Sequence, residues 1–383
     1  MLLLVSELFL VLIFLLVWLK KPHHTLLFIF TVGILLRLIF IVLSLGIDNY
    51  DLNSYRIVGD LTLRGANIFP TEAAAHHPYF PAILYLEAVA RLMGQYSSFF
   101  LKAVFAGFDI GVLWLVYLFT KSRPKALLYA LNPISILISS VHGQFDSIPL
   151  FFFLLSTYHF RPRHEIKGFL IMSIGSTLKT WPLFFVNPLA RRGDYKWYFL
   201  LPFIVPALSV LVYAYFFRAD IYTIIVTIFS YRAVWGVWGI GYLIEALTGH
   251  NGPLTISIAM WTFLAIYTVF AFFYKHKNVL VETTVIMLFF FVLTPVFGIQ
   301  WLMWLAPFYL VEHVPFALWS FILGAAFLIC SYLPWIPQFV GAELPFTPWI
   351  GLAVWGLIIA QFLIQTTPLS SMVKLPSSAK VTS

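Results

Sequence analysis

The chain has 383 residues, of which 61% are hydrophobic and only 10% are charged, and its formal net charge is +8. A water-soluble protein of this size needs more charged residues to cover its surface, so the composition excludes an ordinary soluble protein. The apolar runs are continuous and do not alternate as membrane β-strands do. They predict an all-α, polytopic transmembrane helical bundle.

The apolar runs predict about 11–13 membrane spans, because a spanning helix needs roughly 20 apolar residues. The first run has neither a basic leader nor a small-residue cleavage site, so we expect a span rather than a cleaved signal peptide. In chain order the predicted spans are 2–19, 25–45, 98–120, 126–141, 145–160, 167–178, 180–190, 197–217, 253–274, 280–297, 299–312, 315–334 and 347–366.

Clusters of Lys and Arg lie between these runs and predict the topology. The positive-inside rule places them in the cytoplasm. The clusters are Lys20-Lys21, Lys121–Lys125, Arg161–Lys167, Arg191–Lys196, Lys275–Lys277 and the tail with Lys374 and Lys380. Their position matters more than the net charge, so we predict the lipid bilayer, and no nucleic acid, as the partner of this basic chain.

This topology defines one transmembrane domain, residues 1–366, followed by a cytoplasmic tail, 367–383. Two long loops, 46–97 and 218–252, then lie outside. Only one span fits between the first of them and the basic cluster at Lys121–Lys125. Residues 80–94 therefore cannot cross, and we predict an interfacial helix there.

Several helices are predicted to be short or re-entrant. The segment 167–196 has basic residues at both ends, so it must go out and return, with a turn near Lys179. Each arm has about 11 residues, or roughly 17 Å of helix. Such arms do not cross lipid alone, so we expect them, with the short spans 126–141 and 145–160, to surround an outward-facing cavity.

An acidic motif, Asp48-Asn49-Tyr50-Asp51, directly follows an outward-going span. Carboxylates beside an apolar wall can have a raised pKa and act as a base, so Asp48 and Asp51 are the candidate catalytic residues. The alternative is a solvated helix cap, since Asp and Asn are common at span ends.

Two further polar motifs lie at predicted outer turns. His142-Gly143-Gln144-Phe145-Asp146 joins two short helices, and a turn there needs Gly but not the other polar residues. The alternative is a hydrogen-bonded turn that ties the helices together. Lys179, before Trp181-Pro182, suits an anionic group such as phosphate, although a lysine extending to the interface is a serious competitor.

The second outer loop and a late span supply the remaining candidates. Arg232, beside Trp235, is suited to phosphate binding, with the tryptophan stacking on a sugar or an isoprenoid. The alternative is interfacial aromatic anchoring. Gln300-Trp301 follows a Pro- and Gly-containing break that is also consistent with a structural kink. Asp109 lies within the span 98–120, with Lys102 as one possible partner.

In their order along the chain, these residues resemble the GT-C superfamily of membrane glycosyltransferases. The resemblance is greatest to the catalytic subunit of GPI mannosyltransferase I and to polyprenyl-phosphate-mannose-dependent mannosyltransferases. It covers roughly residues 25–310, and no single motif is specific. It is carried by Asp48-Asn49-Tyr50-Asp51, Tyr55, Gly65–Pro70, Asn132-Pro133, Gly143-Gln144-Phe145-Asp146, Lys179-Thr180-Trp181-Pro182 and Gln300-Trp301-Leu302-Met303-Trp304.

The resemblance implies an inverting hexosyltransferase, with mannose as the expected sugar, that uses a polyprenyl- or dolichyl-phosphate-linked donor and a lipid or glycan acceptor on the extracytoplasmic face. Asp51 is the expected base. Asn49 stands where related enzymes have the first Asp of Asp-x-Asp, which leaves Asp48 as a substitute and leaves open whether a divalent cation takes part. The resemblance fits either a prokaryotic plasma membrane or a eukaryotic ER membrane.

The expected roles of the other site residues follow from the same motifs. We expect Lys179, Arg232 and His142 to bind the donor phosphate. The residues expected to contact substrate are Tyr55, Gln144, Asp146, Trp235, Gln300 and Trp301.

Two other functions stay open on the sequence. A transporter or lipid flippase would place polar groups along a path through the midplane, whereas here they gather on one predicted face. A non-catalytic subunit with the same fold would differ only in lacking a working Asp51.

The predicted topology can be tested with reporter fusions after residues 70 and 122. We expect a reporter active only outside the cytoplasm to be active at residue 70 and silent at residue 122, because one span separates these loops. Equal activity at both positions would contradict the assignment.

Overall fold

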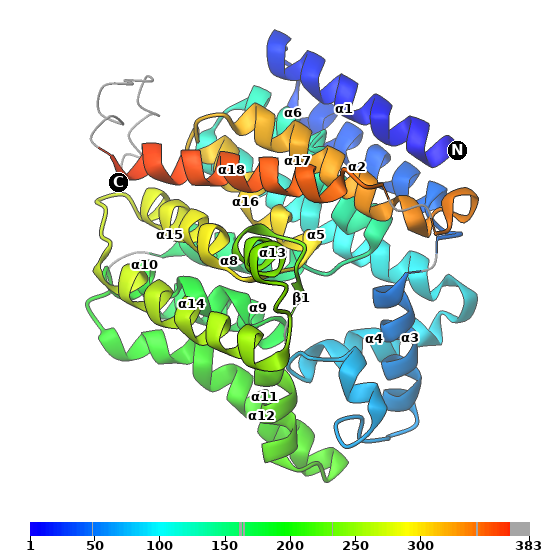
Figure 1. The fold of residues 1–383 in the computed structure, drawn as a ribbon, viewed down its shortest axis with the longest axis vertical. Coiled ribbons are helices and arrows are strands. Elements are labelled where there is room, and N and C mark those ends of the chain that lie inside the picture. The colour runs from blue at the N-terminus through cyan, green and yellow to red at the C-terminus, as the bar shows by residue number, and fades with distance from the viewer. Residues whose placement is uncertain (48, 161–162, 164, 232, 342–343, 368–383) are drawn as a thin grey trace.

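The computed structural model describes residues 1–47, 49–160, 163, 165–231, 233–341 and 344–367. Over this part the chain is a helical bundle, and its only strands are two of two residues each. Long helices run side by side across Figure 1, while α3 (Tyr50–Leu63) and α4 (Ala82–Leu92) lie together at one end of the bundle. The predicted all-α class is therefore confirmed for the described residues.

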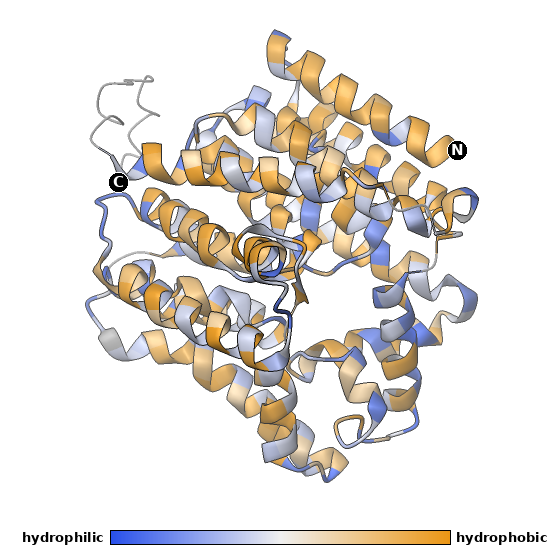
Figure 2. Cartoon of the chain, in the orientation of Figure 1, coloured by the Kyte–Doolittle hydropathy of each residue, from blue (hydrophilic) through white to orange (hydrophobic). Residues whose placement is uncertain are grey.

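Eight helices in the described part are long and apolar enough to cross a membrane. Their length and composition are those of a multi-pass membrane protein. They cover Leu2–Lys20 (α1), Leu26–Leu43 (α2), Gly94–Thr120 (with α5, Ser97–Thr120), Arg123–His142, Trp197–Phe217 (with α11, Leu201–Phe217), Pro253–Phe273 (α14), Ala317–Trp335 (with α17, Ala317–Tyr332) and Thr347–Thr366 (α18). Figure 2 shows mostly hydrophobic residues along α1, α14 and α18, with hydrophilic residues at helix ends and around α3 and α4.

Shorter helices occupy most of the other predicted spans. They are α8 (Ser147–His159), α9 (Glu165–Leu178), α15 (Val279–Leu293) and α16 (Leu302–Val311). The prediction of a second helical arm at 180–190 is wrong. A 3₁₀ turn at Trp181–Phe185 and the short α10 (Asn187–Ala190) replace it, each with a proline in its first turn. Proline lacks the N–H that would continue a preceding helix, so each one starts a new short element.

The segment predicted to be the first outer loop contains a packed helix pair, α3 and α4. Asn49 caps α3 by accepting a hydrogen bond from the Leu52 amide at 2.9 Å. Gly59 lets α3 approach α4 closely, because a Cβ there would lie 2.7 Å from the Glu87 carbonyl oxygen. The predicted helix at 80–94 is present as α4, while its position at a membrane surface remains a prediction.

A small antiparallel ribbon ties the second outer loop to the bundle. Strand β1 (Val234–Trp235) pairs with β2 (Val296–Phe297), with Val234 opposite Phe297. Trp238 stacks on Phe297 with ring centroids 4.0 Å apart. Two segments that lie 62 residues apart in the sequence are therefore paired. The apolar periodicity of the sequence did not predict these strands.

A buried ion pair joins α2, α5 and the Arg123–His142 span. Arg37 donates through Nε to Asp109 Oδ2 at 2.8 Å, and both side chains are almost fully buried. Tyr129 and Ser139 donate to the same carboxylate at 2.8 and 3.2 Å. The suggestion that Lys102 partners Asp109 is wrong, because Lys102 Nζ instead donates to the Ser44 hydroxyl at 2.8 Å.

These contacts hold a π-helical segment, Leu137–His142, in the Arg123–His142 span. Arg37 donates to the Ser135 hydroxyl at 3.1 Å, just before the segment, and Ser44 donates to the Ser140 carbonyl at 3.0 Å. Gly143, with φ +79°, ends the segment in a left-handed conformation that glycine adopts without strain. A π-helical turn widens the backbone spiral, and here it ends on His142.

We expect Arg37→Met to destabilise the protein by about 3–5 kcal/mol, because it leaves the buried Asp109 carboxylate without its cation. The double variant Arg37→Met/Asp109→Leu should be more stable than Arg37→Met alone. Arg91→Met, at the partly exposed Arg91–Asp60 pair, is the matched control and should cost less than about 1 kcal/mol. Unfolding midpoints in detergent measure all three variants, and an unaltered midpoint for Arg37→Met would contradict the structural role.

Candidate functional site

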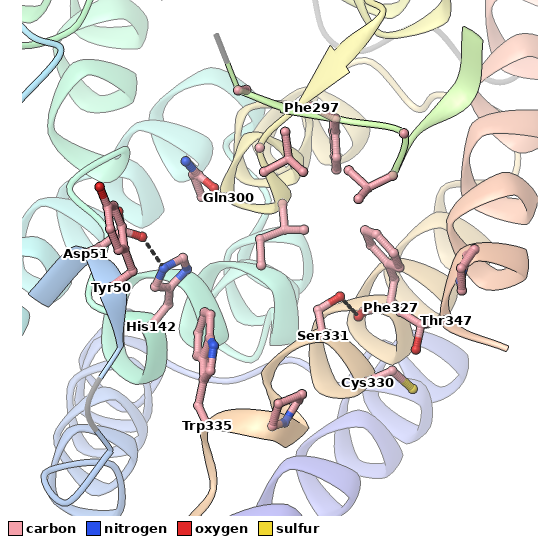
Figure 3. A pocket seen from close by; sticks show the side chains of 18 of the residues that line it. Tyr50, Asp51, His142, Phe297, Gln300, Phe327, Cys330, Ser331, Trp335 and Thr347 are labelled. Carbon is pink, nitrogen blue, oxygen red and sulfur yellow. Dashed lines mark hydrogen bonds and ion pairs between the residues drawn. The ribbon is translucent and has the colours of Figure 1, made fainter. Parts of the chain in front are cut away.

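A cavity of about 660 Å³ lies between α3, the end of the π-helical segment, the β1–β2 ribbon, α17 and the segment before α18. Figure 3 shows Asp51, Tyr50, His142 and Gln300 on one side of it and Phe327, Cys330 and Thr347 on the other. One end of the cavity is therefore polar and the other largely apolar.

Asp51 lies in the first turn of α3, at the polar end. Its Oδ2 atom accepts a hydrogen bond from His142 Nε2 at 2.7 Å, and the side chain stays 27% exposed toward the cavity. Burial raises the pKa of this carboxyl, but the hydrogen bond from His142, followed by Gln144 and Lys179, leaves it below its usual value. Asp51 is therefore an ionised carboxylate at neutral pH, held on one side and open on the other.

His142 is fixed by three residues from two parts of the chain. Its Nδ1 atom lies 3.1 Å from the Tyr332 hydroxyl on α17, and its backbone carbonyl accepts from the Asn49 side chain at 2.8 Å. The Trp335 ring lies against the imidazole with centroids 4.8 Å apart. Since an ionised Asp51 can only accept, Nε2 carries a proton and donates. His142 is therefore the hydrogen-bond donor to Asp51, a contact that the spacing of the motifs in the sequence does not reveal.

A second polar cluster lies beside the first. Lys179 donates to Asp146 Oδ2 at 2.7 Å, and Trp304 donates to Asp146 Oδ1 at 2.7 Å. The Lys179 ammonium also lies over the rings of Phe145 and Tyr79, at 4.6 and 5.3 Å from their centroids. Asp146, predicted to contact substrate, thus forms a buried ion pair with Lys179, predicted to bind the donor phosphate.

Tyr55 and Gln144 lie behind the cavity wall. The Tyr55 hydroxyl donates to Gln144 Oε1 at 3.1 Å, and both side chains are buried. Gln144 also lies close enough to Asp51 to help lower the pKa of that carboxyl. The predicted turn at His142–Asp146 therefore brings His142 to the cavity and keeps Gln144 and Asp146 in the interior beside it.

Of the remaining predicted site residues, one lines the cavity and two lie away from its wall. Gln300 lines the cavity, whereas Trp235 belongs to β1 and Trp301 stacks on Trp304 at 5.2 Å, so neither of these tryptophans lines it. Asp48 and Arg232 lie outside the described residues.

Sequence reasoning missed three aromatic residues around the site. Tyr50 and Trp335 line the cavity, and Tyr332 binds His142 from behind it. Their signal in the sequence is weak, because aromatic residues at the end of an apolar run are also typical of the membrane interface. Only the packing of α17 against the π-helical segment distinguishes the two cases.

The described residues do not form a site for a resident metal ion. No group of three or more His, Cys, Asp or Glu side chains that could hold a metal occurs among them. Asp51 and His142 are hydrogen-bonded to each other, and Asp146 is paired with Lys179. This donor set does not fit a divalent cation.

Comparisons of the chain with protein-family models, with characterised proteins and with solved structures give no match. The candidate function therefore rests on the residues of the site and on their geometry.

Cys330, the one cysteine of the chain, can report on the cavity that it lines. We expect N-ethylmaleimide to label it in the folded protein in detergent, and Thr347→Trp, at the same wall, to slow the labelling several-fold by filling the space. Mass spectrometry measures the rate, with Cys330→Ser as the blank. Thr366→Trp, at the far end of α18, should leave the rate unchanged, and equal rates for all variants would show that Cys330 is reached by another path.

Proposed function

We propose that the chain is a membrane glycosyltransferase that moves a hexose from a polyprenyl-phosphate-linked donor to a lipid or glycan acceptor on the extracytoplasmic face. One observation carries this proposal: a carboxylate, Asp51, is held by His142 on one side and open on the other, at the polar end of a cavity whose far end is apolar. A donor with a polar sugar phosphate and a long apolar chain has the same two-ended character.

In the proposed reaction, Asp51 takes the proton of an acceptor hydroxyl at its free oxygen. The hydroxyl oxygen forms a bond to the anomeric carbon as the bond from that carbon to the phosphate oxygen breaks. The polyprenyl phosphate leaves with the electron pair, and the configuration at the anomeric carbon inverts. General base catalysis of this kind contributes typically 10²–10⁴-fold to a rate.

The leaving phosphate needs hydrogen-bond donors near the cavity. Gln300 lines it, and so does Tyr231, whose pKa is raised to about 12 by burial and by the nearby carboxylates of Asp51 and Asp146. The Tyr231 hydroxyl therefore keeps its proton at neutral pH and can donate it in a hydrogen bond. Lys179 is paired with Asp146, so only part of its positive charge is available to the phosphate. Arg232 is a candidate phosphate ligand from the sequence alone.

Two aromatic side chains support a sugar at the same place. Tyr50 and Trp335 line the cavity on either side of the Asp51–His142 pair. Flat aromatic faces present apolar area with little loss of conformational freedom, which suits the C–H face of a hexose. We propose these residues as the sugar platform, in place of Trp235 and Trp301.

The test is sugar transfer by the purified protein, with labelled mannosyl phosphoryl polyprenol as donor and a membrane lipid extract as acceptor. Asp51→Asn should lower the rate at least about 100-fold, because the amide still accepts from His142 but cannot take a proton. Asp60→Asn, on the same helix but paired with Arg91, is the matched control and should keep the wild-type rate.

The same preparation separates the alternatives. A flippase would move labelled polyprenyl phosphate across a proteoliposome bilayer without cleaving the bond between sugar and phosphate. A non-catalytic subunit would bind the donor and transfer nothing. Transfer by Asp51→Asn at the wild-type rate would remove Asp51 as the base.

A further inference from the structure

Tyr332 occupies an unusual position for a tyrosine in a predicted span. It is one of the largest fully buried side chains of the described chain, and its hydroxyl lies 3.1 Å from His142 Nδ1. Its ring stacks on Trp335 at 4.5 Å and an angle of 17°, and it meets the imidazole edge-on at 5.1 Å. The ring is thus fixed on two sides, and its hydroxyl points at the back of the histidine that holds Asp51.

The direction of these hydrogen bonds follows from the chemistry of the groups. The ionised Asp51 carboxylate accepts from Nε2, so in the neutral imidazole Nδ1 carries no proton and accepts. A tyrosine hydroxyl can supply the proton for that bond. The order is therefore Tyr332 O–H to His142 Nδ1, then His142 Nε2–H to Asp51 Oδ2. A bond of this kind on the second nitrogen fixes both the tautomer and the orientation of a histidine ring.

We infer that Tyr332 is a positioning residue: through His142 it fixes the Asp51 carboxylate so that its free oxygen faces the cavity. The inference rests on the proposed function only for the consequence that this carboxylate acts as a base. It assigns a role to α17, which also contributes Phe327, Cys330 and Ser331 to the cavity wall.

Other charged groups surround this hydrogen-bonded chain. Lys179 and Asp146 lie close enough to act on Asp51 and Tyr332 respectively, and they neutralise each other. From the other side, α1 packs against α17 and places Glu7 within electrostatic range of the Tyr332 hydroxyl. Glu7 is buried, and its Oε1 atom has no hydrogen-bond partner among the described residues. Variants of Tyr332 therefore need to be compared with and without the Glu7 carboxyl.

The first measurement is independent of activity. In protein labelled with ¹⁵N-histidine, the ring nitrogen shifts show which nitrogen carries the proton and whether the other accepts a hydrogen bond, and His142→Gln identifies the signals. We expect wild-type His142 to carry the proton on Nε2 and to accept a hydrogen bond at Nδ1. Tyr332→Phe keeps the ring and should abolish the signature of acceptance, while Asp51→Asn should keep it.

The second measurement is the pH dependence of transfer. With Tyr332→Phe we expect kcat to fall roughly tenfold to a hundredfold with little change in KM, because the base is displaced while the substrate contacts remain. The acid limb should move to higher pH. His142 lowers the pKa of Asp51, so a loosened His142 lets that pKa rise and ionisation then requires a higher pH.

A matched control and an added variant make the result specific. Tyr309→Phe removes another buried tyrosine hydroxyl, one that donates to Gln361 at 2.9 Å, and it should leave kcat, the acid limb and the His142 signals unchanged. Glu7→Gln is added to the wild-type protein and to Tyr332→Phe. The difference between these two proteins then contains no contribution from the Glu7 carboxyl.

The outcomes separate this inference from the proposed function. Unchanged His142 signals and an unchanged acid limb in Tyr332→Phe would overturn the positioning role, even if the wild-type protein transfers sugar. If the His142 signals change as expected but no preparation transfers sugar, the positioning of Asp51 stands and the proposed function fails.

Discussion

A charged or polar side chain inside an apolar helical bundle costs free energy unless it finds a partner, because lipid and an apolar interior offer none. This constraint shapes the protein around three pairs. Arg37 meets Asp109 within the spans, Lys179 meets Asp146 beside the cavity, and His142 meets Asp51 at its edge. The first two carboxylates are buried, whereas Asp51 keeps one side open. The Arg37–Asp109 pair therefore connects packed helices, whereas the His142–Asp51 pair leaves one carboxylate oxygen free to bind a ligand.

The pairs are also connected through the backbone. Arg37, Ser44 and Asn49, from α2 and the loop that follows it, bind Ser135, Ser140 and His142 in succession. The π-helical segment is thus held along one side from the interior to the cavity. A residue buried at a helix interface, such as Arg37, consequently acts on the position of His142 without contacting the cavity.

The sequence predicted the helical class and most of the long helices, because a helix that crosses a membrane needs a long continuous run of apolar residues. It also predicted that Asp51, His142 and Gln300 belong to a site, since polar residues at outer turns have few structural reasons to be there. It could not predict their partners. Apolar composition shows how deep a residue lies in the bundle but not which neighbour it faces, so Lys102 rather than Arg37 was suggested for Asp109. The β1–β2 ribbon and the Tyr332–His142 contact depend on chain segments 62 and 190 residues apart in sequence, and no local pattern encodes them.

The same reasoning explains why the site lies where it does. A carboxylate deep among the spans would be protonated or fully paired, and one in open water would have its ordinary affinity for protons. At the edge of the apolar interior, His142 keeps Asp51 ionised while the cavity gives its free oxygen limited access to water. The segments around the site come from both halves of the chain, and α17 and the 3₁₀ turn that follows it (Leu333–Trp335) place Tyr332 and Trp335 against His142. An arrangement assembled from so many segments can hold a carboxylate in one orientation only if each contact is made, which is why the hydroxyl of a single buried tyrosine can matter to a group it does not touch.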